Sequence, residues 1–148
     1  MKKLLKYGVC LTMLVMVLAL FTGCPDKATG GGWFYDECSG HKCTFGFNAQ
    51  LVEEDVYKGQ FQFQDHETGL KFHMDEITWA DAGLLSVSFH GEDKNEKWVK
   101  VSVTDMGEPG AGDGILGDGI LIVHETLGIY AGFIDGGNIQ LHEEKDKD

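Results

Sequence analysis

Apolar and polar residues alternate with a period of two along most of this 148-residue chain. In the segment 43–51, for example, Cys43, Phe45 and Phe47 alternate with small or polar residues. Successive side chains of a β-strand point to opposite faces, so this period predicts strands with one buried and one solvated face. Further strands are predicted, from alternation or from short apolar runs, over residues 60–64, 70–75, 85–90, 99–104, 120–123, 129–134 and 139–141.

The spacing of these strands predicts the fold class. No helical period follows residue 30, and turn signals such as the predicted hairpin loop from Asp65 to Gly69 separate the strands. About eight or nine short antiparallel strands predict an all-β fold, either a β-sandwich or a closed barrel. The alternation does not choose between the two. The chain length suits a single domain, which we expect to span residues 33–142.

The N-terminus predicts where the protein is located. Three lysines among the first six residues precede an apolar run over residues 9–21, which ends just before Gly23 and Cys24. A basic start, an apolar run and small residues before a cleavage point are typical of a secretory signal. A cysteine at that point resembles a bacterial lipoprotein signal, in which the thiol is acylated. A transmembrane anchor is less favoured, because the run is shorter than about 20 apolar residues.

We therefore predict a lipoprotein signal peptide over residues 1–23 and lipidation at Cys24. The protein would be exported and anchored by lipid to the bacterial cell membrane or outer membrane. The polar, glycine-rich segment 24–32 is expected to act as a tether. Residues 143–148 form a charged tail, which is expected to fray.

The charge of the chain limits its partners. Its net charge is −12, and loss of the three signal lysines would lower this to −15. The chain has no arginine, so the basic clusters that bind phosphates are missing and nucleic acid is not expected as a partner. Acidity of this size fits a soluble surface protein and leaves calcium open as a ligand.

Several sequence blocks look like successive parts of one module. They are GGGW at residues 30–33, CTFGFNAQ at 43–50, GQFQFQDH at 59–66, GLKFH at 69–73, VTDMGEPG at 103–110 and GGNIQLH at 136–142. Together these blocks resemble the post-COAP-1 domain, a bacterial module that often follows choice-of-anchor domains in exported proteins. The resemblance spans nearly all of the chain after the signal. It implies export and adds support for the fold, and it implies no catalytic residues.

Cys38 and Cys43 are the two cysteines left after the signal and the lipidated residue are set aside. If residues 39–42 form a four-residue hairpin loop, the two cysteines face each other with Cβ atoms roughly 4.5–5.5 Å apart, close to bridging distance. We therefore predict a disulfide between them, since bridges persist outside the cytoplasm. A metal site that adds His41 is less favoured, because it lacks a fourth ligand.

Asp105, Glu108, Asp113 and Asp118 are weak calcium candidates in a glycine-rich stretch. Calcium prefers six to eight oxygen ligands on a chain that can wrap around the ion. The spacing of these residues matches neither an EF-hand loop nor the nonapeptide calcium repeat. A solvated acidic loop is the favoured interpretation, and we expect no cofactor and no metal.

No catalytic motif is evident, so we do not expect an enzyme. The chain has no Gly-x-Ser-x-Gly or His-Glu-x-x-His motif and no ordered Ser/His/Asp set. We expect a non-catalytic binding or structural module that contacts the membrane through its lipid and binds an envelope protein or glycan. The alternative is a barrel that carries a small apolar ligand. Its interior would be lined by Phe45, Phe47, Phe61, Phe63 and Phe72.

Overall fold

A computed structural model describes residues 26–53, 56–108, 110–111 and 117–142. The predicted signal peptide, Cys24, Asp113 and the charged tail lie outside these residues. Within the described ranges, no helix is long and apolar enough to cross a membrane. The strands are β1 (Lys27–Tyr35), β2 (Lys42–Glu53), β3 (Val56–Asp65), β4 (Lys71–Ala82), β5 (Ser86–Asp93), β6 (Trp98–Thr104), β7 (Gly119–His124) and β8 (Gly128–His142).

The eight strands form a closed barrel in the order β1 to β8. Each strand pairs antiparallel with the next one, and β8 returns to pair with β1 over Lys27–Phe34. The all-β prediction is confirmed, and the barrel is the correct one of the two predicted forms. Closure leaves no long sheet edge open to pairing with another chain.

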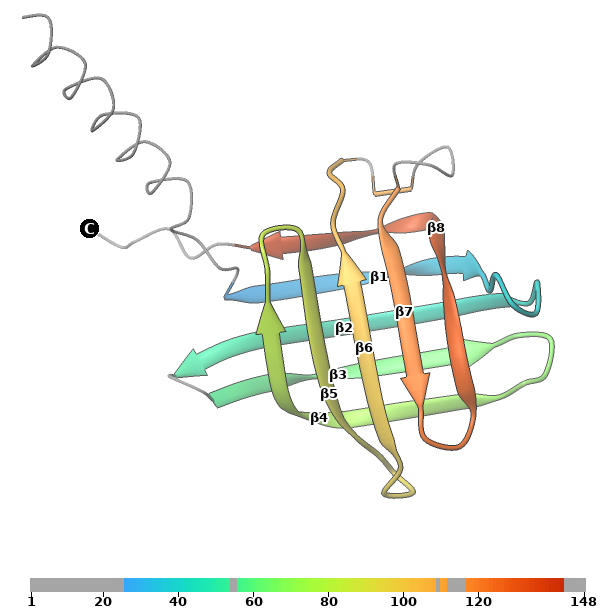
Figure 1. Ribbon diagram of the computed structural model, residues 1–148, viewed down its shortest axis with the longest axis horizontal. Coiled ribbons are helices and arrows are strands. Elements are labelled where there is room, and N and C mark those ends of the chain that lie inside the picture. The colour runs from blue at the N-terminus through green and yellow to red at the C-terminus, as the bar shows by residue number, and fades with distance from the viewer. Residues whose placement is uncertain (1–25, 54–55, 109, 112–116, 143–148) are drawn as a thin grey trace, which may run out of the picture.

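Two strands bend and so belong to both halves of the barrel (Figure 1). In β4, Lys71–Met74 pairs with β3, whereas Met74–Ala82 pairs with β5. The pairing with β5 shifts register twice, between Met74 and Glu76 and between Ile77 and Trp79. In β8, the first half pairs with β7 and the second half with β1. Bulges increase local bending and twist, which is how these long strands turn the corner. As a result β1–β3 cross β5–β7 in the view of Figure 1.

The prediction of a tether over residues 24–32 is wrong for residues 27–32, because these residues belong to β1. Their glycines serve close packing between strands. A Cβ atom at Gly32 would overlap the carbonyl oxygen of Gly136 on β8, and one at Gly137 would overlap that of Gly31. The seam that closes the barrel therefore requires glycine on both strands. The domain accordingly begins before the predicted residue 33.

Inward-facing side chains fill the middle of the barrel. The five phenylalanines proposed as a cavity lining are each less than a tenth exposed. Phe89 of β5 joins them, with its ring centroid 5.4 Å from that of Phe47 and 6.1 Å from that of Phe61. Burying one such side chain stabilises the fold by roughly 1.5–3 kcal/mol. The alternating phenylalanines of β2 and β3 therefore form the core.

Candidate functional site

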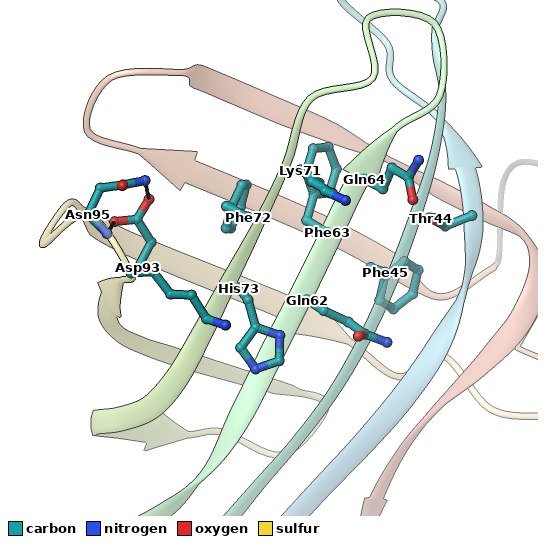
Figure 2. A pocket seen from close by; sticks show the side chains of 11 residues that line it. Thr44, Phe45, Gln62, Phe63, Gln64, Lys71, Phe72, His73, Asp93 and Asn95 are labelled. Atoms are coloured by element: carbon teal, nitrogen blue, oxygen red, sulfur yellow. Dashed lines mark hydrogen bonds between the residues drawn. The ribbon is translucent and has the colours of Figure 1, made fainter.

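A hollow of about 580 Å³ opens over strands β2, β3 and β4 and the hairpin between β5 and β6 (Figure 2). This volume lies within the usual range of ligand pockets, about 300–1,000 Å³. The residues around it are Thr44, Phe45, Gln62, Phe63, Gln64, Lys71, Phe72, His73, Asp93, Lys94 and Asn95.

The strand register decides which of these residues face the hollow. Two rows cross the three strands: Thr44, Gln64 and Lys71 in one, and Gly46, Gln62 and His73 in the other. The phenylalanines at the alternate positions are at most 8% exposed. The open side of the hollow is therefore formed by polar side chains on the outer face of the barrel. Figure 2 shows Gln62 and His73 projecting side by side from neighbouring strands.

A glycine on β2 lies opposite one of the glutamines of the hollow. Gly46 has no side chain, and an added Cβ atom would lie 3.0 Å from Nε2 of Gln62. Gln62 therefore lies across the bare backbone of β2. Trp33 of β1 is paired with Thr44, but its indole lies against Gly136 of β8, and Nζ of Lys42 lies over the ring. The outer face at the hollow thus places amides, a hydroxyl and an imidazole on one rigid sheet.

The charges at the hollow differ from those of the whole chain, whose net charge is −12. Lys71 and Lys94 form no salt bridge with any residue in the described ranges. His73 lies 2.9 Å from Asp75, measured from Nε2 to Oδ1. Two ammonium groups therefore face a site whose other exposed lining groups are uncharged or already paired.

Asp93 positions the hairpin that walls one side. Its Oδ1 accepts the backbone N–H groups of Asn95 at 2.8 Å and Lys97 at 2.9 Å, and its Oδ2 accepts Nε2–H of His124 at 3.2 Å. Burial alone would raise the pKa of Asp93, but these hydrogen bonds outweigh it and lower the pKa. Asp93 is therefore ionised, both of its carboxylate oxygens accept hydrogen bonds, and it holds the β5–β6 hairpin in place.

The same arrangement recurs at all four hairpins of this barrel end. Asp36, Asp65, Asp93 and His124 are buried, and each lies at or just after the end of an odd-numbered strand. Each accepts backbone N–H groups from its own turn, which come from Ser39, from Glu67 and Thr68, from Asn95 and Lys97, and from Thr126 and Leu127. Because their polar atoms are bonded, these residues close the barrel end at little desolvation cost.

Sequence analysis missed this device, although a signal for it exists. Three of the four turns have glycine four residues after the buried polar residue, in the strings DECSG, DHETG and HETLG. Gly40, Gly69 and Gly128 all have positive φ, which glycine adopts without strain. The fourth turn has Glu96 at φ 59° instead. An acidic residue or histidine followed by glycine at this spacing predicts three of the four turns.

His41 lies at the end of the first of these turns and contacts the buried acid of the second, Asp65. Its Nδ1 donates a hydrogen bond to Oδ2 of Asp65 at 2.9 Å, while Oδ1 of Asp65 accepts the backbone N–H of Glu67 in the turn. This hydrogen bond raises the pKa of His41 above 6.5. Burial would raise the pKa of Asp65, but the bonds from His41 and from the Thr68 and Glu67 backbone lower it overall. The pair therefore favours its ionised form.

The predicted disulfide is wrong, since both cysteines are free thiols. Cys43 is paired with Phe34 on β1 and Asp65 on β3, so its cross-strand neighbours are not Cys38. The loop is longer than predicted because β1 ends at Tyr35, and it leaves Cys38 exposed. Burial, with Asp65 and Asp36 nearby, raises the pKa of Cys43 to about 12. Cys43 is therefore an inert core thiol, and His41 is engaged with Asp65 instead of the cysteines.

Three of the four calcium candidates hold the β6–β7 connection against β8. Oδ2 of Asp118 accepts the N–H of Ile139 at 2.8 Å, and Oδ2 of Asp105 accepts that of Leu141 at 3.0 Å. Oε1 of Glu108 accepts the Asn138 and Gln140 amides, each at 2.7 Å. These carboxylates satisfy a stretch of β8 that β7 does not reach. The fourth candidate, Asp113, lies outside the described residues.

Asp118 is the most deeply buried of these acids, with no exposed surface. Desolvation, with smaller effects from Asp105 and Glu108, raises its pKa despite the bonds it accepts. In the ranges that the structure covers, no three His, Cys, Asp or Glu side chains are arranged to hold a metal ion. The acidic stretch thus has a structural role, which is to anchor a loop.

A second hollow, of about 200 Å³, lies at the opposite end of the barrel, near the first described residues. Small inward side chains line it, among them Ala28, Ala49, Ala80, Ala82 and Val87. Charged and polar residues surround these side chains, namely Asp26, Lys27, Gln50 and Asp81. This hollow is where a carrier of small apolar ligands would open.

No protein family, curated protein or solved structure matches this chain.

Proposed function

We propose that this protein is an exported, lipid-anchored, non-catalytic module that binds a glycan through the hollow over β2–β4. The observation that carries the proposal is the lining of that hollow. Gln62 and Gln64 each offer amide donors and an acceptor, and Thr44 and His73 add a hydroxyl and an imidazole. Sugar hydroxyls are donors and acceptors as well, so such a set matches them.

The sheet beneath these side chains supports the proposal. Strand pairing fixes the spacing of both rows, so the groups are arranged before a ligand arrives. Preorganisation reduces the entropy that binding costs. An envelope protein, the other predicted partner, offers fewer hydroxyls per area for this lining.

The proposed location rests on the N-terminal sequence and on the resemblance to a domain of exported proteins. An acyl anchor at Cys24 would hold the barrel close to a membrane, where envelope glycans are concentrated. Metabolic labelling with a fatty acid tests this part. Labelling is expected for the native chain and is expected to be lost in Cys24→Ser; labelling that survives in the variant would contradict the anchor.

Glycan binding is tested by titrating oligosaccharides into the full chain in a polyoxyethylene detergent, which contains no sugar. Gln62→Ala and Gln64→Ala should each weaken binding about 3- to 10-fold, the equivalent of one lost neutral hydrogen bond. Gln60→Ala is the matched control, because Gln60 is exposed on the same face of β3 but lies outside the hollow. Equal effects at all three positions, or none, would refute the site.

The apolar carrier remains the second candidate because of the alanine-lined hollow at the barrel mouth. A fluorescent fatty acid distinguishes the two functions. The glycan module is expected to show no saturable uptake of this probe. Two results together would favour the carrier. The fatty acid would bind saturably and lose this binding in Ala49→Phe, and Gln62→Ala would leave glycan binding unchanged.

A further inference from the structure

Two lysines in the hollow are not explained by recognition of neutral sugars. Lys71 begins β4, and Lys94 lies in the β5–β6 turn, so the fold brings them to one site from separate elements. Two other lysines of the barrel are engaged. Lys97 pairs with Glu125 at 3.4 Å, and Nζ of Lys42 lies 4.4 Å from the centre of the Trp33 ring. Across the described ranges, neither Lys71 nor Lys94 has such a partner.

We infer that the glycan is acidic and that its anionic group is bound by the ammonium groups of Lys71 and Lys94. This inference rests on the proposed glycan-binding function. The shared ligand chemistry is a carboxylate or phosphate carried on a sugar chain. The amides of Gln62 and Gln64 bind the hydroxyls of the same chain, and the two lysines supply complementary charge.

The acidic groups that the structure describes close to the hollow form no ion pair with either lysine. Asp93 is 8% exposed, and both of its oxygens accept hydrogen bonds from the hairpin and from His124. Asp75 is bound to His73 at 2.9 Å. An anion at the hollow therefore meets two ammonium groups that form no ion pair within the described residues.

The net charge of −12 sets the conditions under which binding is to be measured. At about 0.01 M salt the screening length is about 30 Å, so distant carboxylates repel an anionic ligand. At about 0.15 M salt it is about 8 Å, and the lysines in the hollow dominate. Affinity for an acidic glycan should therefore survive at physiological salt. A nonspecific charge effect would not produce such affinity, because a protein with this net charge repels anions.

The test uses oligogalacturonate and its methyl ester, which share one sugar chain and differ in the carboxylate charge. A phosphorylated oligosaccharide is the third probe and identifies the source of the anion. Each is titrated into the full chain in polyoxyethylene detergent at 0.15 M salt. We expect at least about tenfold tighter binding of one acidic probe than of the methyl ester, since hydrogen bonds between charged groups are the stronger ones.

The double variant Lys71→Gln/Lys94→Gln should remove this preference, so that it binds the acidic probe no more tightly than the methyl ester. Lys100→Gln is the control, because Lys100 is on the outer face of β6, away from the hollow. Equal affinity for acidic and esterified probes, with both sensitive to Gln62→Ala, would overturn the acidic preference and leave glycan binding intact. Failure of every probe to bind would overturn both proposals.

Discussion

At the scale of single residues, the hairpin turns show how a buried polar group organises the end of the barrel. Asp65 is 1% exposed, yet its carboxylate is satisfied by one imidazole and by two backbone N–H groups. A buried acid with this many partners stabilises the fold while it is ionised. Stability should therefore depend on pH through this group.

Asp65→Asn tests that dependence. The lowered pKa of Asp65 means that its contribution is present above about pH 3.8 and is lost as the pH falls through the lowered pKa. The raised pKa of His41 has the opposite sign: its contribution is present below pH 6.5 and is lost as the pH rises through the raised pKa. Urea unfolding should show the largest difference between native and variant proteins between these two limits. A difference that does not vary with pH would contradict the pairing.

Glu96 is the one turn residue among these with positive φ that is not glycine. A left-handed conformation costs an ordinary residue about 1–2 kcal/mol. Glycine avoids this cost, but it also increases the entropy of the unfolded chain, which offsets part of the gain. Glu96→Gly should therefore raise the free energy of unfolding by about 0.5–1 kcal/mol. Gly69→Ala should lower it by about 1–2 kcal/mol, since φ there is 73° and the site is otherwise open. Shifts of the same sign would refute this account of the turns.

At the scale of elements, the β1–β8 seam depends on glycine for close approach of two backbones. Gly32→Ala places a Cβ atom on the Gly136 carbonyl group and should cost about 1–3 kcal/mol, as overpacking does. Gly31→Ala is the matched control on the next residue, where the nearest neighbouring atom is an ordinary 3.5 Å away. It should be neutral, or stabilising by up to about 1 kcal/mol. Thermal melts of both variants decide the matter, and equal losses would contradict a seam that depends on Gly32.

The same seam explains why sequence analysis failed at β1. A strand is recognised from alternation of large apolar residues, whereas Gly30 and Gly32 occupy inward positions that have room for no side chain. Their composition is the same as that of a flexible tether. Likewise, the disulfide prediction assumed a four-residue loop, whereas β1 ends at Tyr35 and places Phe34 opposite Cys43. Both errors concern pairing partners, which local sequence does not contain.

At the scale of the whole molecule, alternation was sufficient to predict the all-β class and the inward position of the five phenylalanines. It was insufficient for barrel closure, because closure depends on pairing between the first and last strands. The hollow was not predicted for a similar reason. Gln62 and Gln64 are ordinary outward residues of one strand. They form a site only because the register places Gln64 between Thr44 and Lys71, and Gln62 between Gly46 and His73.

The central claim is that the outer face over β2–β4, and not the barrel interior, is the functional surface. The most direct measurement is a two-dimensional NMR titration of the full chain with oligogalacturonate, following the side-chain amides of Gln62 and Gln64 and the backbone amides of all residues. The account predicts saturable shifts at Thr44, the two glutamines and His73, with Ala49 and Ala80 at the barrel mouth unmoved. Shifts confined to the mouth, or none on the outer face, would contradict it.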